Sequence, residues 1–397
     1  MAGVSPDADT RRQIALIGAT VTTETILTNA TLVLPADTIA GTVVLRGGVI
    51  ADIQPGRSSA LAATDLDGDT LIPGVVDVHT DNLERQVQPR ANARWPSRSA
   101  MVAHDVQCAA AGVTTVLDAL CLGDLGFDTD RIETFLNGVP DLDALAGAGL
   151  LKAEHFLHLR CEVPAMDMLD HFNTAVDHPR VRMVSLMDHS PGEGQYANLD
   201  YYRALRRRSG LDDAAIERRI AELRDQRARL RNPNRRALLD RLAGRGVALA
   251  SHDDRTEAEI AENVADGIRI SEFPVTMAAA QAAKRHGMQV IAGAPNIVRG
   301  GSHSGNVAAG DLLDAGAVDA FASDYVPPSL VEAAFRSAQG IGLPAAVAMV
   351  TGTPARMAGL ADRGRLEPGL QADVVRVRLY QGLPIVRQVW RSGERVI

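Results

Sequence analysis

The sequence predicts an α/β fold, a TIM-like (β/α)8 barrel, with a small β-sandwich domain formed by both termini. Eight strand-like segments in the middle of the chain alternate with helix-like stretches, a pattern typical of a parallel sheet with crossover helices. Both ends of the chain are instead rich in Val, Ile, Leu and Thr between turn residues. The main alternative, an open doubly wound sheet, is disfavoured because no GxGxxG turn is present.

Composition excludes several classes of protein. The chain has 397 residues, and its 41 basic and 49 acidic residues give a net charge of −8. This balance argues against a nucleic-acid binder or a binder of anionic membranes. No apolar run approaches the roughly 20 residues of a transmembrane helix, and three cysteines are too few for a disulfide framework. We therefore expect a cytoplasmic protein.

The two ends of the chain define the small domain. Residues 1–22 are expected to be a flexible polar tail. Residues 23–72 contain strand-like sequences such as "TILTNATLVLP", and residues 363–397 have the same β-rich composition. The sequence therefore predicts one small β domain made of 23–72 and 363–397.

The barrel is expected over residues 73–362. Its eight predicted strands are 74–81, 112–120, 155–162, 181–189, 246–254, 268–276, 288–295 and 317–325. An arginine-rich helical insertion covers 199–244, with Asp212 as an N-cap and Ile216, Ile220 and Leu223 on one helical face. Its charges most simply form a solvated face, and a lid or a subunit contact is the alternative.

Candidate functional residues gather where the predicted strands end. The carboxyl ends of barrel strands converge on one rim. Strand alternation places Asp77, His79 and Asp81 on the inward face, and Val76 and Val78 toward the helices. A histidine and a carboxylate two residues apart can bind one metal ion. The alternative is a surface His–Asp pair that binds no metal.

Five other strands end in similar residues. His158, Arg160 and Glu162 share one strand face, and His252 follows small residues on another. The remaining candidates at strand ends are Asp188, His189, Glu272 and Asp324. Imidazoles mixed with carboxylates suit Zn²⁺ first, with Mn, Fe, Ni or Mg as alternatives. We predict one or two divalent ions per subunit, and Asp324 as the base that deprotonates water.

A family resemblance rests on the first strand. "LIPGVVDVHTD" (71–81) closely resembles the first-strand signature of the amidohydrolase superfamily, in which Asp81 replaces a second histidine. The predicted fourth strand has no lysine for the carbamylated bridge of many members, and Glu162 could supply that carboxylate, as in the deacetylase-like branch. The resemblance thus implies a metal site whose ligands are His79, Asp81, Glu162, His252 and Asp324.

Longer blocks resemble one subfamily, the triphosphate diphosphatases of the carbon–phosphorus lyase pathway of phosphonate metabolism. They include 77–96, 185–196 and "GAPNIVRGGSHSGN" (293–306). The resemblance implies hydrolysis of α-D-ribose 1-methylphosphonate 5-triphosphate to the 5-phosphate and diphosphate. His189 would then be a further ligand or would protonate the leaving group.

Such a substrate requires a local basic pocket in an acidic protein. The glycines of the loop after the seventh strand would let backbone N–H groups approach phosphate oxygens, although a plain turn and surface ion pairs are the alternatives. The candidate phosphate-binding residues are Arg85, Arg90, Arg94, Arg160, Arg299, Ser302, His303 and Ser304.

Two other functions remain open at this point. One is an amidohydrolase that acts on a C–N bond, a deacetylase or deaminase, with a small and possibly phosphorylated substrate. The other is a non-catalytic scaffold, which the complete set of candidate ligands disfavours. The expected partner is a small triphosphorylated sugar phosphonate, without nucleic acid or membrane, and a homo-oligomer is expected.

Overall fold

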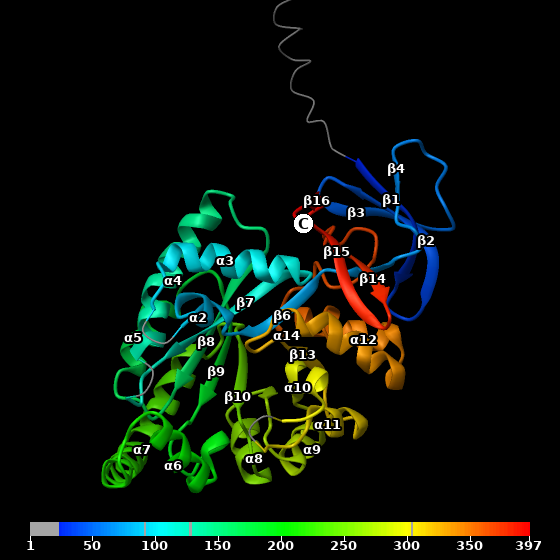
Figure 1. Ribbon diagram of the computed structural model, residues 1–397. Coiled ribbons are helices and arrows are strands. Elements are labelled where there is room, and N and C mark those ends of the chain that lie inside the picture. Colours follow the sequence, from blue (N-terminus) through cyan, green and yellow to red (C-terminus); the bar gives the residue numbers. More distant parts are fainter. Residues whose placement is uncertain (1–23, 91–92, 127–128, 303–304) are drawn as a thin grey trace, which may run out of the picture.

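A computed structural model describes residues 24–90, 93–126, 129–302 and 305–397 (Figure 1). The predicted tail, residues 1–22, lies outside the described residues. Among the described helices, none combines the length and the apolar character that crossing a membrane requires.

The centre of the molecule is an eight-stranded parallel sheet, as the sequence predicts. Its strands pair with their neighbours in chain order. They are β6 (Val75–Thr80), β7 (Val113–Leu122), β8 (Glu154–Glu162), β9 (Val181–Met187), β10 (Ala248–His252), β11 (Ile270–Glu272), β12 (Gln289–Gly293) and β13 (Ala320–Ala322). Each of the eight predicted strand segments therefore overlaps a strand.

Hydrogen bonds between the first and last strands bring the sheet close to a closed barrel. At the carboxyl end, Thr80 and Asp324 form a parallel bridge. The Asp324 N–H donates to the His79 carbonyl at 3.0 Å, and the Asp81 N–H donates to the Asp324 carbonyl at 2.9 Å. These bonds fix three candidate site residues beside one another.

The barrel interior is filled by side chains from all eight strands. They include Val76, Val78, Leu117, Phe156, Met183, Ala250, Ile270, Ile291 and Ala320. The prediction that Val76 and Val78 face the helices is therefore wrong. The pairing of β6 with β7 shifts register between Asp77 and Thr80, and such an irregularity re-aims side chains, so His79 turns inward as well.

Helices cover the outside of the barrel and its carboxyl rim. They are α2 (Asn82–Val87), α3 (Ser97–Ala110), α4 (Thr129–Gly147), α5 (Met168–Ala175), α6 (Leu199–Arg208), α7 (Asp213–Leu242), α8 (Glu257–Ala265), α9 (Met277–Arg285), α10 (Ala294–Arg299), α11 (Ala309–Asp314), α12 (Ser329–Ile341), α13 (Leu343–Ala348) and α14 (Gly352–Met357). The strand-to-helix order follows the sequence, which is typical of this architecture.

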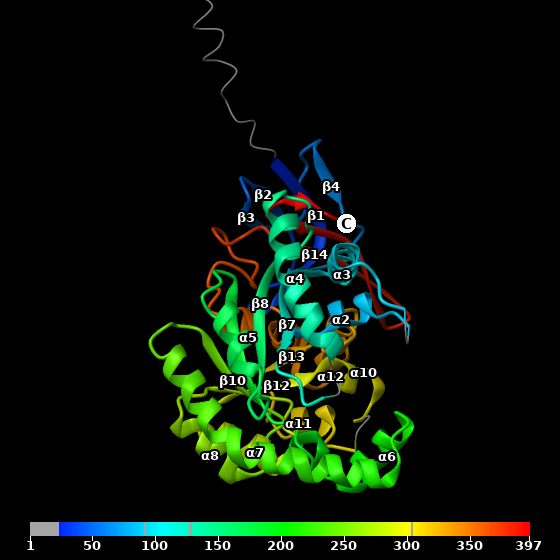
Figure 2. The same cartoon turned by 90° about the vertical axis from the view of Figure 1, so that its left-hand side faces the viewer.

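The predicted helical insertion holds α6 and α7. The Asp212 carboxylate accepts a hydrogen bond from the Ala215 N–H, so it caps α7 as expected. Tyr202 of α6 packs with Ile216 and Ile220 of α7, and against Tyr196. The pair lies at the end of the barrel opposite the small sheet (Figures 1 and 2).

A separate mixed sheet contains both ends of the described chain. Its strands are β1 (Glu24–Val33), β2 (Thr38–Arg46), β3 (Val49–Pro55), β4 (Ala63–Asp65), β5 (Thr70–Pro73), β14 (Val374–Tyr380), β15 (Leu383–Arg391) and β16 (Glu394–Arg395). β14 pairs with β5, which joins the two terminal segments. One apolar cluster holds Leu27, Ile50 and Trp390 together, so this sheet has its own core.

Candidate active site

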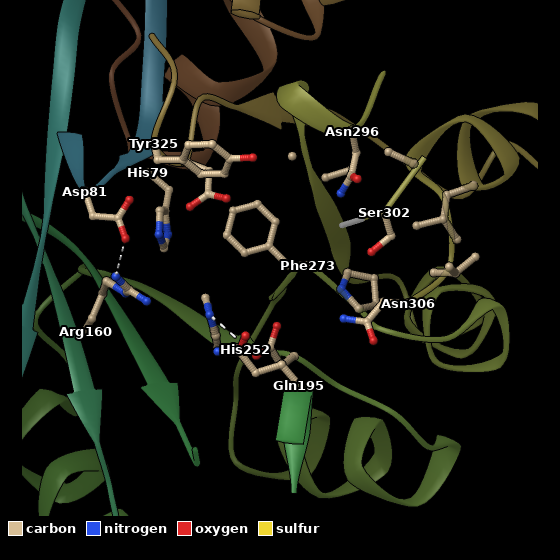
Figure 3. Close-up of a pocket in the computed structure, with 18 of the residues that line it drawn as sticks. His79, Asp81, Arg160, Gln195, His252, Phe273, Asn296, Ser302, Asn306 and Tyr325 are labelled. Carbon is tan, nitrogen blue, oxygen red and sulfur yellow. Dashed lines mark hydrogen bonds and ion pairs between the residues drawn. The ribbon is translucent and has the colours of Figure 1, made fainter. Parts of the chain in front are cut away.

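A cavity of about 380 Å³ opens at the carboxyl rim of the barrel. Its lining includes His79 and Asp81 at the end of β6, His252 at the end of β10 and Asp324 after β13. Figure 3 shows His79, Asp81 and Arg160 on one side of this space and Asn296, Ser302 and Asn306 on the other. The structure thus brings residues from distant parts of the chain to one rim.

His79, Asp81 and Asp324 form a first group of possible metal ligands. One ligand atom from each lies within 4.8 Å of the others. Asp324 adopts a left-handed backbone conformation with φ of 56°, which is costly for a residue other than glycine and is typical of functional sites. Burial and the charge of Asp81 raise the pKa of Asp324 well above its usual value.

Two arginines hold the Asp81 carboxylate from one side. Asp81 Oδ2 lies 3.2 Å from a guanidinium nitrogen of Arg160 and 3.5 Å from one of Arg131, on α4. Although burial opposes it, the charges of these arginines lower the pKa of Asp81. The other oxygen, Oδ1, is buried and has no hydrogen-bond partner among the described residues.

The fully buried Glu272 carboxylate orients two histidines. It lies 3.1 Å from His79 Nδ1 and 3.4 Å from His252 Nδ1. Burial opposes the ionisation of Glu272, but the neighbouring imidazoles lower its pKa well below the usual value. If each Nδ1–H donates to this carboxylate, the Nε2 atoms of both rings become available to a metal, which is the usual arrangement behind metal-binding histidines.

His158 also lies beside Glu272 but has other hydrogen bonds. Its Nδ1 donates to the Val78 carbonyl at 3.0 Å, and its Nε2 lies 2.9 Å from the Ser185 hydroxyl. Burial lowers the pKa of His158 to about 3, so the ring is neutral. We therefore place His158 in the support of the site rather than among the ligands.

A second group of possible ligands consists of His189, His252 and Asp253. Glu162 accepts hydrogen bonds from the backbone N–H of His189 at 2.8 Å and from its Nδ1 at 2.7 Å. Burial opposes protonation of His189, but the charges of Glu162 and Asp253 raise its pKa to about 10. Because both Glu162 oxygens contact His189, the structure places Glu162 behind this ring, whereas the sequence predicts it as a direct ligand.

The donor atoms fit one or two divalent cations. Three buried atoms at the two groups have no hydrogen-bond partner within the described ranges: Asp81 Oδ1, and His189 Nε2 and Asp253 Oδ2, which lie 3.6 Å from each other as an ion pair. Buried polar atoms are nearly always satisfied, so such atoms need a partner. Imidazole nitrogens and carboxylate oxygens are the donors that Zn²⁺, Mn²⁺ and Fe²⁺ accept.

The predicted phosphate-binding residues lie in different places. Arg160 and Ser302 line the cavity. Arg85 donates to the Tyr325 carbonyl at 2.6 Å, and so supports a residue of the cavity wall. Arg94 pairs with Asp130 and Glu133 of α4 at 3.3 and 3.1 Å, so the structure does not bring it to the cavity.

The remaining predicted phosphate-binding residues do not line the cavity among the described residues. Arg90 and Arg299 are exposed and lie outside the cavity lining. His303 and Ser304 lie outside the described residues.

Several residues of the site are missed by the sequence analysis. They are Arg131, Gln195, Asp253, Phe273 and Asn296, whereas Asn306 belongs to the predicted phosphate-binding loop and does line the cavity. Asp253 had a signal, because it follows His252 directly at a strand end. Arg131 had none, since it starts from the first turn of a helix and reaches Asp81 only through the tertiary fold.

Comparisons with known proteins give a close relative and many fold neighbours. No protein-family model matches the chain. The alpha-D-ribose 1-methylphosphonate 5-triphosphate diphosphatase of Escherichia coli (strain K12) is 42% identical over 376 residues, which are 94% of this chain and 100% of that protein.

Solved structures with lower identity share the fold. The 5-methylcytosine deaminase from Klebsiella pneumoniae has a TM-score of 0.63 at 15% identity, over 94% of this chain and 97% of its own. The N-acetyl-D-glucosamine-6-phosphate deacetylase from Mycobacterium smegmatis has a TM-score of 0.62 at 16% identity, over 94% and 100%. An amidohydrolase has a TM-score of 0.57 at 17% identity, over 94% and 99%. The fold is therefore that of the amidohydrolases, and the chain belongs to the family of alpha-D-ribose 1-methylphosphonate 5-triphosphate diphosphatases.

Proposed function

We propose that this hydrolase cleaves α-D-ribose 1-methylphosphonate 5-triphosphate into the 5-phosphate and diphosphate, as a step of phosphonate catabolism. The observation that carries the proposal is the 42% identity to a diphosphatase of that name over its whole length. The site supports it, because possible metal ligands and two arginines meet in a single cavity. The fold neighbours that act on C–N bonds share at most the architecture at their 15–16% identity.

The metal ligands in this proposal come from two neighbouring groups. His79, Asp81 and Asp324 would hold one divalent ion, and His189, His252 and Asp253 would hold a second. Such an ion, when bound, lowers the pKa of water and neutralises charge on phosphoryl oxygens. Zinc is the proposed metal, supported by the mixed imidazole and carboxylate donors, with Mn, Fe, Ni and Mg as alternatives.

The side chains of the cavity perform the remaining work. Asp324 accepts a proton from the attacking water, the water oxygen bonds to the α-phosphorus, and the bond from the α-phosphorus to the bridging oxygen breaks. Diphosphate leaves with that bridging oxygen. Arg131 and Arg160 face the same space and neutralise charge on the phosphoryl oxygens. His189 is proposed to protonate the leaving diphosphate or to act as a ligand.

The cellular setting is also a proposal. Three buried free cysteines support a reducing compartment, for which we propose the cytoplasm. A homo-oligomer stays a prediction, and the solution mass of the purified protein tests it.

The experiment is a measurement of diphosphate release from the proposed substrate with Zn²⁺ or Mn²⁺ supplied. Asp324→Asn and His79→Ala should each lower kcat by at least 100-fold, because they remove the proposed base and a ligand. Asp311→Asn, an exposed carboxylate on α11, is the matched control and should keep normal activity. If the wild-type protein hydrolyses only sugar-phosphate amides, the proposal is wrong.

A further inference from the structure

The two sides of the cavity differ in charge. On one side lie His79, Asp81 and Arg160 (Figure 3), together with Arg131, which pairs with Asp81, and Asp324, which is grouped with His79 and Asp81. The residues labelled on the opposite side in Figure 3, Asn296, Ser302 and Asn306, are neutral. Phe273 lies between the two sides in this view. The cavity therefore offers one strongly charged end and one neutral polar end to a ligand.

Three amide side chains line the cavity, Asn296 and Asn306 at its neutral end and Gln195 beside His252 (Figure 3). Gln195 follows β9 and precedes α6, Asn296 lies in α10, and Asn306 lies between α10 and α11. All three line the cavity and are partly buried. Their side-chain amides form no hydrogen bond with any residue in the described part of the chain, so their donors and acceptors are available to a ligand.

Gly293, at the end of β12, adds an independent observation. Its φ of −73° and ψ of 119° are ordinary for any residue, so the backbone does not require glycine there. A Cβ at this position would lie 3.8 Å from Asn296 Nδ2 and 3.9 Å from the Phe273 ring, which are ordinary contacts. The protein could thus accommodate a side chain, and its absence leaves free space in the cavity wall between Asn296 and Phe273.

The substrate of the proposed function has two unlike ends. The triphosphate carries several negative charges and suits the arginines and a metal. The methylphosphonate ester carries a single charge, and the ribose carries hydroxyl groups. Amide N–H groups can donate to the phosphonate oxygens, and amide oxygens can accept from the hydroxyls.

From this match we propose that Gln195, Asn296 and Asn306 bind the ribose 1-methylphosphonate end of the substrate, while Gly293 leaves room for it. This inference rests on the proposed function and adds which residues determine substrate specificity. Binding of this end at the neutral side directs the triphosphate to Asp324 and the two arginines. The same contacts discriminate against triphosphates that lack the phosphonate. With such a substrate, the amide N–H groups have no phosphonate oxygen to donate to, and those hydrogen bonds are lost.

The test compares two substrates, α-D-ribose 1-methylphosphonate 5-triphosphate and ribose 5-triphosphate, which lacks the phosphonate. Asn296→Ala and Asn306→Ala should each lower kcat/KM for the first substrate by about 10-fold or more, mainly through KM, since each removes a hydrogen bond to a charged group. With ribose 5-triphosphate, kcat/KM should change by less than about 3-fold. Asn137→Ala, an exposed asparagine on α4, is the matched control.

A second variant avoids any loss of hydrogen-bonding groups. Gly293→Ala should fold normally and should raise KM for the phosphonate substrate more than for ribose 5-triphosphate, whereas Gly340→Ala on α12 should change neither. Equal losses with both substrates, or no loss in any of the three cavity variants, would overturn the inference while leaving the proposed function intact. No diphosphate release by the wild-type protein would instead reject the proposed function itself.

Discussion

The structure assigns Glu162 the role of orienting His189 rather than of binding a metal directly. Its two oxygens accept hydrogen bonds from the His189 backbone and ring. Replacing such a supporting carboxylate costs about 10- to 100-fold in metal affinity or activity. Glu162→Gln should therefore weaken binding of a divalent ion by that factor in a calorimetric titration. Glu257→Gln, which removes an exposed ion pair with Arg285, is the control and should bind metal normally.

Substitutions of Arg131 and Arg94 should affect substrate binding differently. Arg131 lines the cavity and contacts Asp81, whereas Arg94 pairs with acidic residues on α4 outside it. Arg131→Gln should raise KM for any triphosphate substrate by about 10-fold, because it removes a charge-assisted contact. Arg94→Gln should leave KM within about 2-fold. Steady-state kinetics decide, and a larger effect at Arg94 would contradict the placement.

The site could be predicted from sequence where a strand end carries the residue. His79, Asp81, His252 and Asp324 are predicted from strand ends and do meet at one rim. That Val78 and His79, which are adjacent in β6, both face the interior is not predictable by alternation, because the register shift between Asp77 and Thr80 breaks the two-residue period. Arg131 and Asn296 could not be found, since side chains from helices reach the cavity only through tertiary packing.

A buried histidine and aspartate network joins three elements, α3, β7 and β8. His155 of β8 lies 2.9 Å from Asp118 of β7 and 3.2 Å from Asp105 of α3. Burial disfavours the charged ring, but these carboxylates raise the pKa of His155 to about 9 from 6.5. The protonated form therefore stabilises the packing of α3 on the sheet.

This network predicts how stability depends on pH. The pKa of His155 is higher in the folded state than in the unfolded state. Protonated His155 therefore makes its full contribution to the free energy of unfolding below about pH 6.5, and this contribution is lost as pH rises through about 9. The loss is on the order of 3 kcal/mol. Urea unfolding at pH 6, 8 and 9.5 should show it. His155→Gln should abolish this decline, whereas the exposed His286→Gln should retain it, and equal slopes in all three proteins would contradict the prediction.

At the scale of elements, periodicity was sufficient for the barrel. Each of the eight strands overlaps its predicted segment, because strand-like runs alternate with helices long enough to cross back. Six lie wholly within it, whereas β7 extends two residues beyond its predicted end and β8 begins one residue before its predicted start. The predicted helical insertion is likewise occupied by α6 and α7. The contact of this insertion with Tyr196 in the cavity wall could not be predicted, since Tyr202 and Tyr196 meet only after the helices pack.

The whole molecule should unfold as one unit, although it has two sheets. A single apolar cluster contains Val375 and Val389 of the small sheet together with Val113 of β7 and Leu330 of α12. Neither sheet can expose its part of this cluster without exposing the other's, and a shared core couples the two transitions.

Tryptophan fluorescence can test this coupling because the chain has only two tryptophans. Trp390 is buried in the core of the small sheet, whereas Trp95 is 54% exposed. In the Trp95→Phe variant, fluorescence reports the small sheet, while far-UV circular dichroism is dominated by the many barrel helices. The two signals should give the same urea midpoint. Val389→Ala leaves a buried cavity, which should lower the free energy of unfolding by about 1–3 kcal/mol. Both urea midpoints should therefore fall together. An earlier midpoint by fluorescence alone would show that the small sheet unfolds separately, and that the shared cluster does not bind it to the barrel.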